Sequence, residues 1–318
     1  MAKKPTALVT GGAGFIGSNI VAELLRRKWN VRILDNFSAG KREHLEGLSA
    51  SDIELVEGDI RSLTDCEHAC RGVDYVFHQA ALRSVPRSVD EPQVTNEVNV
   101  TGTLNMLQAA KKRGVRRLVY ASSSSAYGDS KKMPQREDHT PMPFSPYAVS
   151  KLAGEHYCQT YAKTFGLETV SLRYFNVYGP NQDPESKYSA LIPGFLSQLG
   201  RGEPFEVHWD GKQSRDFTYV GDVAQANLLA ALAPKASGQV FNIAGGRGIT
   251  VLEVAKRLVK IIGKDPGRRH TPRRQGDVRT TLASIARARR ILGYKPTVKF
   301  DDGLRRTVEY FQKLGLVS

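Results

Sequence analysis

Short apolar runs alternate with segments of helical spacing through the first half of the chain. The runs predict strands at residues 6–10, 31–34, 53–56, 75–77 and 118–121. The segments between them predict helices at residues 15–27, 62–71 and 94–113. Because strand–helix–strand alternation gives parallel strands joined by right-handed crossovers, the pattern predicts an α/β fold with a doubly wound parallel sheet.

The pattern becomes less regular after Arg173, where Gly179-Pro180 and Asp183-Pro184 mark turns. Further strands are predicted at residues 205–208, 216–219 and 240–243, and further helices near residues 190–199, 223–233 and 252–262. We therefore expect two units. Residues 1–175 hold the sheet, with returns from later segments, and residues 176–318 form mainly a smaller mixed α/β domain.

Positive charge is the unusual feature of the composition. The 318 residues include 46 Lys and Arg against 32 Asp and Glu, a net charge of +14. Ten basic residues fall between Lys264 and Lys295, where only Asp265 and Asp277 oppose them. Aromatic side chains do not interleave this stretch, as a platform for stacked bases would require, so nucleic acid is not the expected partner. A solvated basic face containing one or two arginines for an anionic small molecule is favoured.

The remaining composition is ordinary. Forty per cent hydrophobic and 25% charged residues are typical of a soluble globular protein and exclude a disordered or fibrous chain. The three cysteines, Cys66, Cys70 and Cys158, predict no disulfide framework and no metal site, and they favour a reducing, cytoplasmic location. No apolar run approaches 18 residues, so no membrane span or membrane partner is expected.

A glycine-rich turn follows the first predicted strand and opens the first predicted helix. Gly11, Gly14 and Gly17 allow a tight turn, close approach to a pyrophosphate, and close packing of the helix on the sheet. The second strand ends at Asp35, whose carboxylate suits the adenine ribose hydroxyls and disfavours a 2′-phosphate. Asp59 follows the third strand, where an adenine would lie. The segment therefore predicts a site for NAD rather than NADP.

Tyr147 and Lys151 lie four residues apart, on one face of a predicted helix. Free tyrosine has a pKa of about 10 and is a poor base near neutral pH, but a neighbouring ammonium and an oxidised nicotinamide ring favour the phenolate. A run of four serines at residues 122–125 follows a strand and can hold a substrate hydroxyl whose proton Tyr147 removes. Together with the glycine-rich turn, these motifs predict an active site beside the cofactor.

Taken together, these motifs resemble the extended short-chain dehydrogenase/reductase family over essentially the whole chain. The matching segments are 11–17 (GGAGFIG), 35–38 (DNFS), 58–60 (GDI), 78–81 (HQAA), 96–105 (NEVNVTGTLN), 122–128 (SSSSAYG), 145–151 (SPYAVSK), 173–179 (RYFNVYG) and 214–219 (SRDFTY). More narrowly, the chain is similar to UDP-sugar 4-epimerases, and most to the subgroup acting on UDP-N-acetylglucosamine. The resemblance implies a Rossmann domain that binds NAD and a smaller domain that binds a UDP-sugar.

The resemblance also implies roles for single residues. Tyr147 would be the general base, Lys151 its electrostatic partner and a ribose anchor, and Ser123 the catalytic serine. Asn99 and Tyr174 would line the nicotinamide half of the cofactor, with Arg83 near its pyrophosphate. The full set implied to bind the cofactor is Gly11, Gly14, Phe15, Ile16, Asp35, Asn36, Ser38, Gly40, Asp59, Ile60, Gln79, Ala80, Ala81, Arg83, Asn99, Tyr147, Lys151 and Tyr174.

A second set of residues is implied to bind the UDP-sugar: Ser84, Ser123, Ser124, Asn176, Gln182, Ala190, Arg215, Arg274 and Thr281. Asn176, Arg215 and Arg274 would hold the diphosphate, since guanidinium groups suit phosphate oxygens. Gln182 and Ser124 would face the sugar, and Ala190 begins the segment expected near the uracil. Thr281 occupies a gate to the sugar 2-substituent, and its small side chain leaves room for an N-acetyl group.

The implied reaction inverts C4 of UDP-N-acetylglucosamine or UDP-N-acetylgalactosamine through a 4-keto intermediate, and it extends to UDP-glucose and UDP-galactose. The absence of Asp and Glu from residues 124–126 argues against relatives that eliminate water or carbon dioxide. A UDP-glucose 4-epimerase and a UDP-glucuronate 4-epimerase are the alternatives, and Asn176 argues against the latter. A non-catalytic NAD-binding protein is a more remote one. A homodimer is also implied, with residues 94–113 and 145–165 at its interface.

Overall fold

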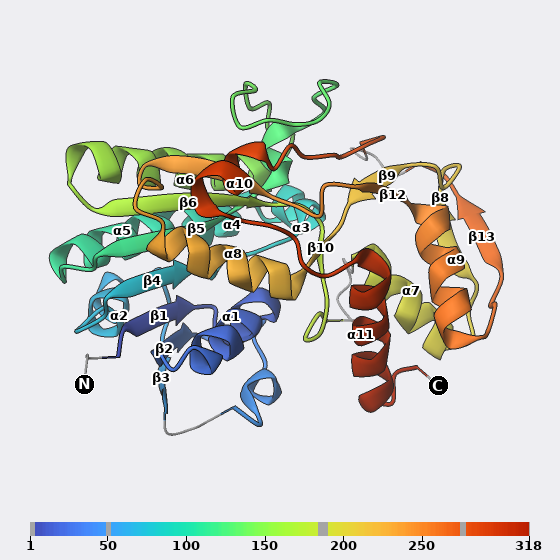
Figure 1. Cartoon of the computed structure of the whole chain (residues 1–318), viewed down its shortest axis with the longest axis horizontal. Coiled ribbons are helices and arrows are strands. Elements are labelled where there is room, and N and C mark those ends of the chain that lie inside the picture. The colour runs from blue at the N-terminus through green and yellow to red at the C-terminus, as the bar shows by residue number, and fades with distance from the viewer. Residues whose placement is uncertain (1–3, 49–51, 184–189, 274–277, 318) are drawn as a thin grey trace.

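A parallel sheet of seven strands forms the centre of the larger unit (Figure 1). The computed structural model describes residues 4–48, 52–183, 190–273 and 278–317. The strand order is β11-β6-β5-β4-β1-β2-β3, and each neighbouring pair is parallel. The strands are β1 (Thr6–Thr10), β2 (Asn30–Asp35), β3 (Ile53–Glu57), β4 (Tyr75–His78), β5 (Arg117–Ser123), β6 (Glu168–Tyr174) and β11 (Gln239–Ile243). The order reverses between β1 and β4, which opens a crevice at their carboxyl ends.

Helices cover both faces of this sheet (Figure 1). On one face lie α1 (Phe15–Arg26), α8 (Val220–Leu232) and α10 (Ala286–Leu292). On the other lie α2 (Leu63–Ala69), α5 (Gly102–Lys112) and α6 (Pro146–Thr164). Each layer of helices encloses its own apolar core against the sheet, so the predicted doubly wound α/β fold is confirmed.

Three short segments precede α5 along the chain. They are α3 (Val85–Asp90), α4 (Pro92–Asn96) and a π-helical turn over Glu97–Thr101. The helix predicted at residues 94–113 is therefore continuous but locally widened before α5 begins. This widened segment carries Asn99 toward the loop after β4.

The smaller unit surrounds a third apolar core, which includes Phe195, Leu258 and Phe311. Its helices are α7 (Leu191–Gly200), α9 (Val251–Ile262) and α11 (Phe300–Lys313). Its strands form three pairs: β8 (Phe205–His208) with β13 (Arg268–Thr271), β7 (Val177–Tyr178) with β10 (Thr218–Tyr219), and β9 (Ser214–Asp216) with β12 (Gly248–Thr250). The helix α9 begins with a capping box formed by Thr250 and Glu253 and ends at Gly263, which has a φ of 80°.

The hydrophobic pattern missed several elements. The pattern did not predict β6, because Ser171 and Arg173 interrupt its apolar residues, although both side chains are buried. The strand predicted at residues 216–219 is two short strands, β9 and β10, separated at Phe217. The helices α10 and α11 were not predicted either. The predicted strand at residues 240–243 is β11, which returns to the large sheet beside β6.

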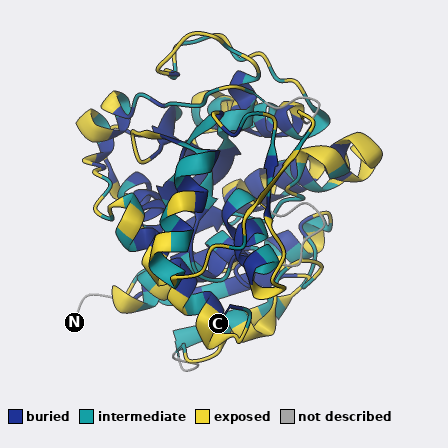
Figure 2. Ribbon diagram, turned by 90° about the vertical axis from the view of Figure 1, so that its right-hand side faces the viewer, coloured by how far each residue is buried: buried dark blue, intermediate teal, exposed yellow. Residues whose placement is uncertain are grey.

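Burial follows this layered arrangement. Figure 2 shows buried residues concentrated in the interior between the layers, while exposed residues line the outer faces of helices and the loops. Among the described residues, no helix is both long and apolar enough to cross a bilayer.

Candidate active site

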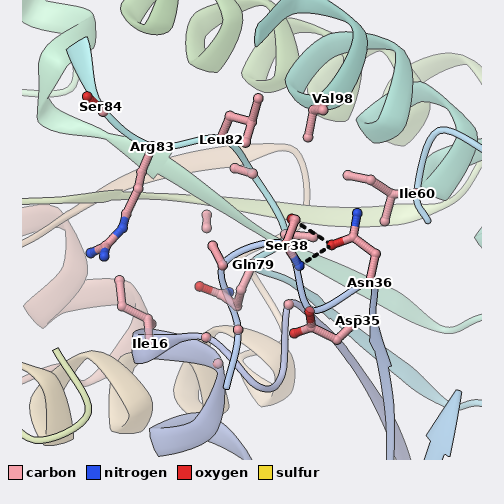
Figure 3. Close-up of a pocket in the computed structure, with 18 of the residues that line it drawn as sticks. Ile16, Asp35, Asn36, Ser38, Ile60, Gln79, Leu82, Arg83, Ser84 and Val98 are labelled. Atoms are coloured by element: carbon pink, nitrogen blue, oxygen red, sulfur yellow. Dashed lines mark hydrogen bonds between the residues drawn. The ribbon is translucent and has the colours of Figure 1, made fainter. Parts of the chain in front are cut away.

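A pocket of about 660 Å³ opens at the carboxyl ends of the sheet strands, at the reversal of strand order. Figure 3 shows Asp35, Asn36 and Ser38 toward one side of it and Arg83 and Ser84 toward the opposite side. Parallel sheets of this kind bind ligands at such a crevice. The pocket therefore combines the first glycine-rich turn with the ends of β2, β4 and β5.

The glycine-rich turn brings the start of α1 to the wall of the pocket. Gly11 has a φ of 65°, and a Cβ placed there would lie 2.9 Å from the backbone of Ala80. Gly14 is the N-cap of α1 and provides no side-chain cap, while Phe15 and Ile16 of the first turn line the pocket. The amides at this helix end are consequently suited to a diphosphate.

Asp35, the last residue of β2, fixes the backbone next to the glycine-rich turn through hydrogen bonds. Its carboxylate accepts hydrogen bonds from the amides of Ala13 and Phe37, each at 2.9 Å, and it lies against the pocket. Asn36 donates to the Asp59 carboxylate at 2.9 Å. The hydrogen bond from Arg61 lowers the pKa of Asp59 to about 2, so this carboxylate is ionised at neutral pH. The region is polar and anionic, which suits ribose hydroxyls better than another phosphate.

Most residues implied to bind the cofactor line this pocket. They are Gly11, Gly14, Phe15, Ile16, Asp35, Asn36, Ser38, Gly40, Asp59, Ile60, Gln79, Ala80, Ala81, Arg83, Tyr147, Lys151 and Tyr174. Asn99 differs, because its buried amide bonds both backbone groups of Leu82, at 2.8 and 3.0 Å, and the Ser150 hydroxyl. Asn99 therefore lies behind the pocket wall and fixes the loop that carries Arg83. Ser84, expected on the substrate side, also lines the pocket.

Helix α6 delivers Tyr147 and Lys151 to the pocket from its first two turns. Ser145 caps the helix by accepting a hydrogen bond from the Ala148 amide at 3.2 Å, and Pro146 occupies the first helical position. Lys151 is 4% exposed, and its ammonium donates to the Ala121 carbonyl at 2.9 Å. Burial lowers its pKa to about 8, so it is still charged at neutral pH.

The Tyr147 phenol is subject to opposing influences. Burial raises its pKa above the ordinary value, whereas the hydrogen bond with Ser123 and the positive charge of Arg83 lower it. Ser123 ends β5, and its hydroxyl also contacts the Ser125 hydroxyl at 3.0 Å. The arrangement can thus hold a substrate hydroxyl between a serine and a tyrosine and remove its proton.

A buried ion pair fixes α6 beneath these residues. The Arg173 guanidinium of β6 donates two hydrogen bonds to the Glu155 carboxylate of α6, at 2.8 and 2.7 Å. The Ser122 hydroxyl donates to the same carboxylate. Both charged side chains are less than 5% exposed. Glu155 lies one turn beyond Lys151, so this pair joins the catalytic face of α6 to two sheet strands. The sequence motifs did not predict this pair.

Asn227 is a second residue that the motifs did not predict. Its side chain exchanges hydrogen bonds with the Tyr174 phenol at 2.8 and 3.0 Å and accepts one from Gln79 at 3.2 Å. Asn227 is fully buried on α8, whereas Tyr174 and Gln79 line the pocket. A polar side chain within an otherwise apolar helix face was the available sequence signal.

The residues expected to bind substrate gather partly at the neighbouring edge. The Asn176 amide donates to the Thr281 hydroxyl at 3.2 Å and to the Asp216 carbonyl at 3.1 Å. Asp216 in turn accepts from the Ala283 amide at 3.1 Å, which holds the segment carrying Thr281. Arg215 belongs to the same strand, β9.

The other expected substrate residues are more dispersed. Gln182 is 4% exposed, and its side-chain oxygen is buried without a hydrogen-bond partner among the described residues. Ser124 begins the short 3₁₀ turn after β5, and Ala190 is the N-cap of α7. Arg274 lies outside the described residues. The orphaned oxygen of Gln182 is suited to a ligand that donates a hydrogen bond.

Arg83 provides a testable electrostatic contribution at Tyr147. Replacing Arg83 by glutamine removes a charge that favours the phenolate, so the kcat profile is expected to shift toward higher pH. A shift of one pKa unit corresponds to about a tenfold lower kcat at neutral pH. Arg87→Gln is the matched control, because Arg87 also lines the pocket but pairs with Glu91. If Arg83→Gln retained the cofactor less tightly but showed the wild-type pH dependence of kcat, the interaction of Arg83 with Tyr147 would be contradicted.

The pocket has three parts that suit a dinucleotide. The polar recess at Asp35 suits a ribose, the start of α1 suits the diphosphate, and the far end holds Tyr147 and Lys151. A protein with such a pocket belongs to the class of enzymes that use a nicotinamide cofactor. Comparison with known families makes the assignment definite. The chain belongs to the NAD dependent epimerase/dehydratase family, whose model matches residues 7–244. NAD is therefore its cofactor.

Individual relatives match nearly the whole chain. The UDP-glucose 4-epimerase of Mycolicibacterium smegmatis is 37% identical over 309 residues, which cover 96% of this chain and 98% of that protein. The UDP-N-acetylglucosamine 4-epimerase of Methanobrevibacter ruminantium M1, solved with UDP-N-acetylmuramic acid, has a TM-score of 0.94 and 38% identity, with 98% and 99% coverage. The UDP-glucose 4-epimerase of Thermus thermophilus, solved with NAD, has a TM-score of 0.88 and 39% identity, with 96% and 99% coverage.

Proposed function

We propose that this protein is a UDP-sugar 4-epimerase that interconverts UDP-N-acetylglucosamine and UDP-N-acetylgalactosamine, and also UDP-glucose and UDP-galactose. The observation that carries this proposal is the meeting of Ser123, Tyr147 and Lys151 at a pocket fitted to NAD. The named relatives support the reaction, because they include 4-epimerases for both kinds of UDP-sugar. The NAD-binding half is proposed as residues 1–175, with returns from later segments such as β11, and residues 176–318 as mainly the substrate half.

The proposed roles follow from the positions of the side chains. Tyr147 removes the proton from the sugar 4-hydroxyl, which Ser123 orients by hydrogen bonding. The buried Lys151 ammonium stabilises the phenolate and anchors the cofactor ribose. NAD supplies the site that accepts the C4 hydride and returns it. After oxidation, the 4-keto sugar turns about its diphosphate link, and Tyr147 returns the proton as the opposite face is reduced.

Most of the proposed substrate contacts lie on the smaller unit. Asn176, Arg215 and Arg274 hold the diphosphate, and the N-terminal segment of α7 from Ala190 contacts the uracil. Gln182, Ser84 and Ser124 face the sugar, and Gln182 has the free acceptor that such a contact needs. Residues 124–126 carry no carboxylate, which supports epimerisation over the elimination of water or carbon dioxide. Because Ser123, Tyr147 and Lys151 are all present, a non-catalytic NAD-binding protein is disfavoured.

Thr281 is the proposed determinant of sugar choice. Its hydroxyl meets Asn176, and its side chain is small enough to leave room for an N-acetyl group. Wild-type protein is therefore expected to convert both UDP-N-acetylglucosamine and UDP-glucose. A protein that converts UDP-glucose alone would fit the alternative UDP-glucose 4-epimerase, and one that converts only UDP-glucuronate would fit the other alternative.

Replacing Thr281 by tyrosine is expected to narrow this pocket. We expect kcat/KM for UDP-N-acetylglucosamine to fall about 10- to 200-fold more than that for UDP-glucose, the range that steric fit provides. Thr281→Ser is the control and is expected to keep the wild-type ratio. Equal losses on both substrates in Thr281→Tyr would contradict the gate. Both values are measured by following product formation at several substrate concentrations.

A homodimer and a reducing, cytoplasmic location complete the proposal. Val149 of α6 is 54% exposed, and α6 packs against α4 and α5 on one side of the sheet. Such an exposed apolar side chain suits contact with a second copy. The three cysteines are buried free thiols, and burial raises the pKa of each to about 12. Neither nucleic acid nor membrane is a proposed partner.

A further inference from the structure

A second cavity, of about 860 Å³, lies between the smaller unit and the helices α8 and α10, and its described lining residues all differ from those of the cofactor pocket. It is bounded by the start of α11, the segment that precedes it, the loop between β11 and β12, and the ends of β7 and β10. Its size falls within the range of small-molecule sites. The proposed epimerisation leaves this cavity unused, since none of the proposed substrate residues that the structure describes lines it.

Besides Arg257, four basic side chains from three segments line this cavity. They are Arg247 in the β11–β12 loop, Arg289 on α10, and Lys295 and Lys299 before α11. Within the described part of the chain, none of the four forms an ion pair, and all four are exposed. Four cations converging from separate segments create a strongly positive site unless an anion is bound.

The acidic residues of the cavity wall are already engaged. Asp222 accepts hydrogen bonds from the Thr297 amide and hydroxyl, at 2.9 and 2.7 Å, which ties the segment before α11 to α8. Asp301 pairs with Arg257 at 2.9 Å. Neither carboxylate pairs with the four basic side chains described above. Four positive charges therefore share the cavity with one carboxylate, Asp222, that has no ion-pair partner among the described residues, and the excess is left for a ligand to neutralise.

Aromatic rings form another part of the lining. Phe217, Tyr219 and Phe300 are partly exposed at the cavity, and the buried Tyr178 contacts all three rings at centroid distances of 5.2 to 6.1 Å. This cluster is a rigid surface against which a flat ring can pack. Cations next to aromatic faces suit a ligand that joins phosphates to a heterocycle.

We propose that this cavity binds a nucleoside polyphosphate, separately from the UDP-sugar and NAD. Arg247, Arg289, Lys295 and Lys299 neutralise the phosphates, and the aromatic cluster contacts the base. Arg289 and Lys295 belong to the basic stretch recognised in the sequence, so the site gives a purpose to part of the charge that the epimerase reaction leaves unexplained. Its binding does not depend on which UDP-sugar the active site accepts.

Isothermal titration calorimetry tests this proposal with ATP as the probe. ATP is titrated into NAD-loaded protein saturated with UDP, which occupies the proposed substrate site. We expect one ATP site per chain and at least tenfold weaker binding by the double variant Arg289→Gln/Lys299→Gln. The control is Arg290→Gln/Lys313→Gln, which removes the same charge from exposed positions outside the cavity. It is expected to bind ATP within about twofold of wild type.

The outcomes separate this site from the active site and from general surface charge. Tripolyphosphate is expected to bind several-fold more weakly than ATP, because it lacks a base. Equal weakening of ATP binding in the two double variants would overturn the proposal, as would absence of ATP binding or release of bound UDP by ATP. Tripolyphosphate binding as tightly as ATP would overturn the assignment of the base to the aromatic cluster. Thermal unfolding of both double variants checks that these exposed changes preserve the fold.

Discussion

Replacing Tyr147 by phenylalanine is expected to lower kcat about 100- to 10,000-fold, the contribution typical of a positioned proton-transfer group. The phenol lies on the first turn of α6, contacts Ser123, and lines the pocket with Lys151. Phenylalanine keeps the ring but removes the group that accepts the proton. Because the change deletes one oxygen, NAD is expected to stay bound, and the loss should appear in kcat rather than in cofactor content.

The pH dependence of kcat provides a second test of the role of Tyr147, because its expected direction is known. Only the Tyr147 phenolate accepts the proton, and its fraction increases as pH rises, so wild-type kcat is expected to increase from pH 6 toward pH 8. Burial lowers the pKa of Lys151 to about 8, so the ammonium that supports the phenolate is lost above that pH. Tyr157→Phe on the same helix is the control and is expected to keep both rate and profile. A Tyr147→Phe protein with a wild-type profile would contradict the assigned base.

Replacing Glu155 by glutamine is expected to reduce the free energy of unfolding by about 3–5 kcal/mol, because it leaves the Arg173 guanidinium buried without its counter-charge. Glu155 receives hydrogen bonds from Arg173 and Ser122 and is 2% exposed. The loss is measured by urea unfolding of the NAD-loaded protein. Tyr147 and Lys151 are also expected to lose their fixed position, since all three side chains project from α6 toward the strands.

Two comparisons make this stability prediction specific. Glu23→Gln breaks the exposed pairs with Arg26 and Arg27 and is expected to cost at most about 1 kcal/mol. The double variant Glu155→Leu/Arg173→Met removes both buried charges and is expected to be more stable than Glu155→Gln. Equal unfolding free energies for Glu155→Gln and Glu23→Gln would contradict the role assigned to the buried pair.

The sequence predicted those parts of the fold in which local pattern and burial agree. The first strand, the glycine-rich turn and α1 were predictable because apolar spacing and backbone requirements coincide there. The strand β6 was not, because buried Ser171 and Arg173 interrupt its apolar residues, and Arg173 pairs with Glu155, a partner 18 residues away along the chain that no local pattern reveals. Most of the cofactor pocket was predictable from motifs, since each motif follows a strand and the strand ends meet.

The remaining features depend on contacts between distant segments. Asn99 was expected at the nicotinamide, but its amide is committed to Leu82 and Ser150. The motifs did not predict Asn227 or Glu155, because their hydrogen-bond partners, Tyr174 and Arg173, lie 53 and 18 residues away along the chain. The second cavity could not be predicted either, because its four cations come from three segments that only the fold brings together. The basic stretch alone showed the charge and not its arrangement.

The most direct test of the proposed function is to incubate the purified protein with UDP-N-acetylglucosamine, without adding cofactor, and follow the anomeric protons by NMR. The proposal predicts that UDP-N-acetylgalactosamine appears and levels off at an equilibrium mixture, since NAD is retained and regenerated in each turnover. Absence of this product with and without added NAD would contradict the proposed reaction on this substrate, and conversion of UDP-glucose in the same conditions would place the error at Thr281.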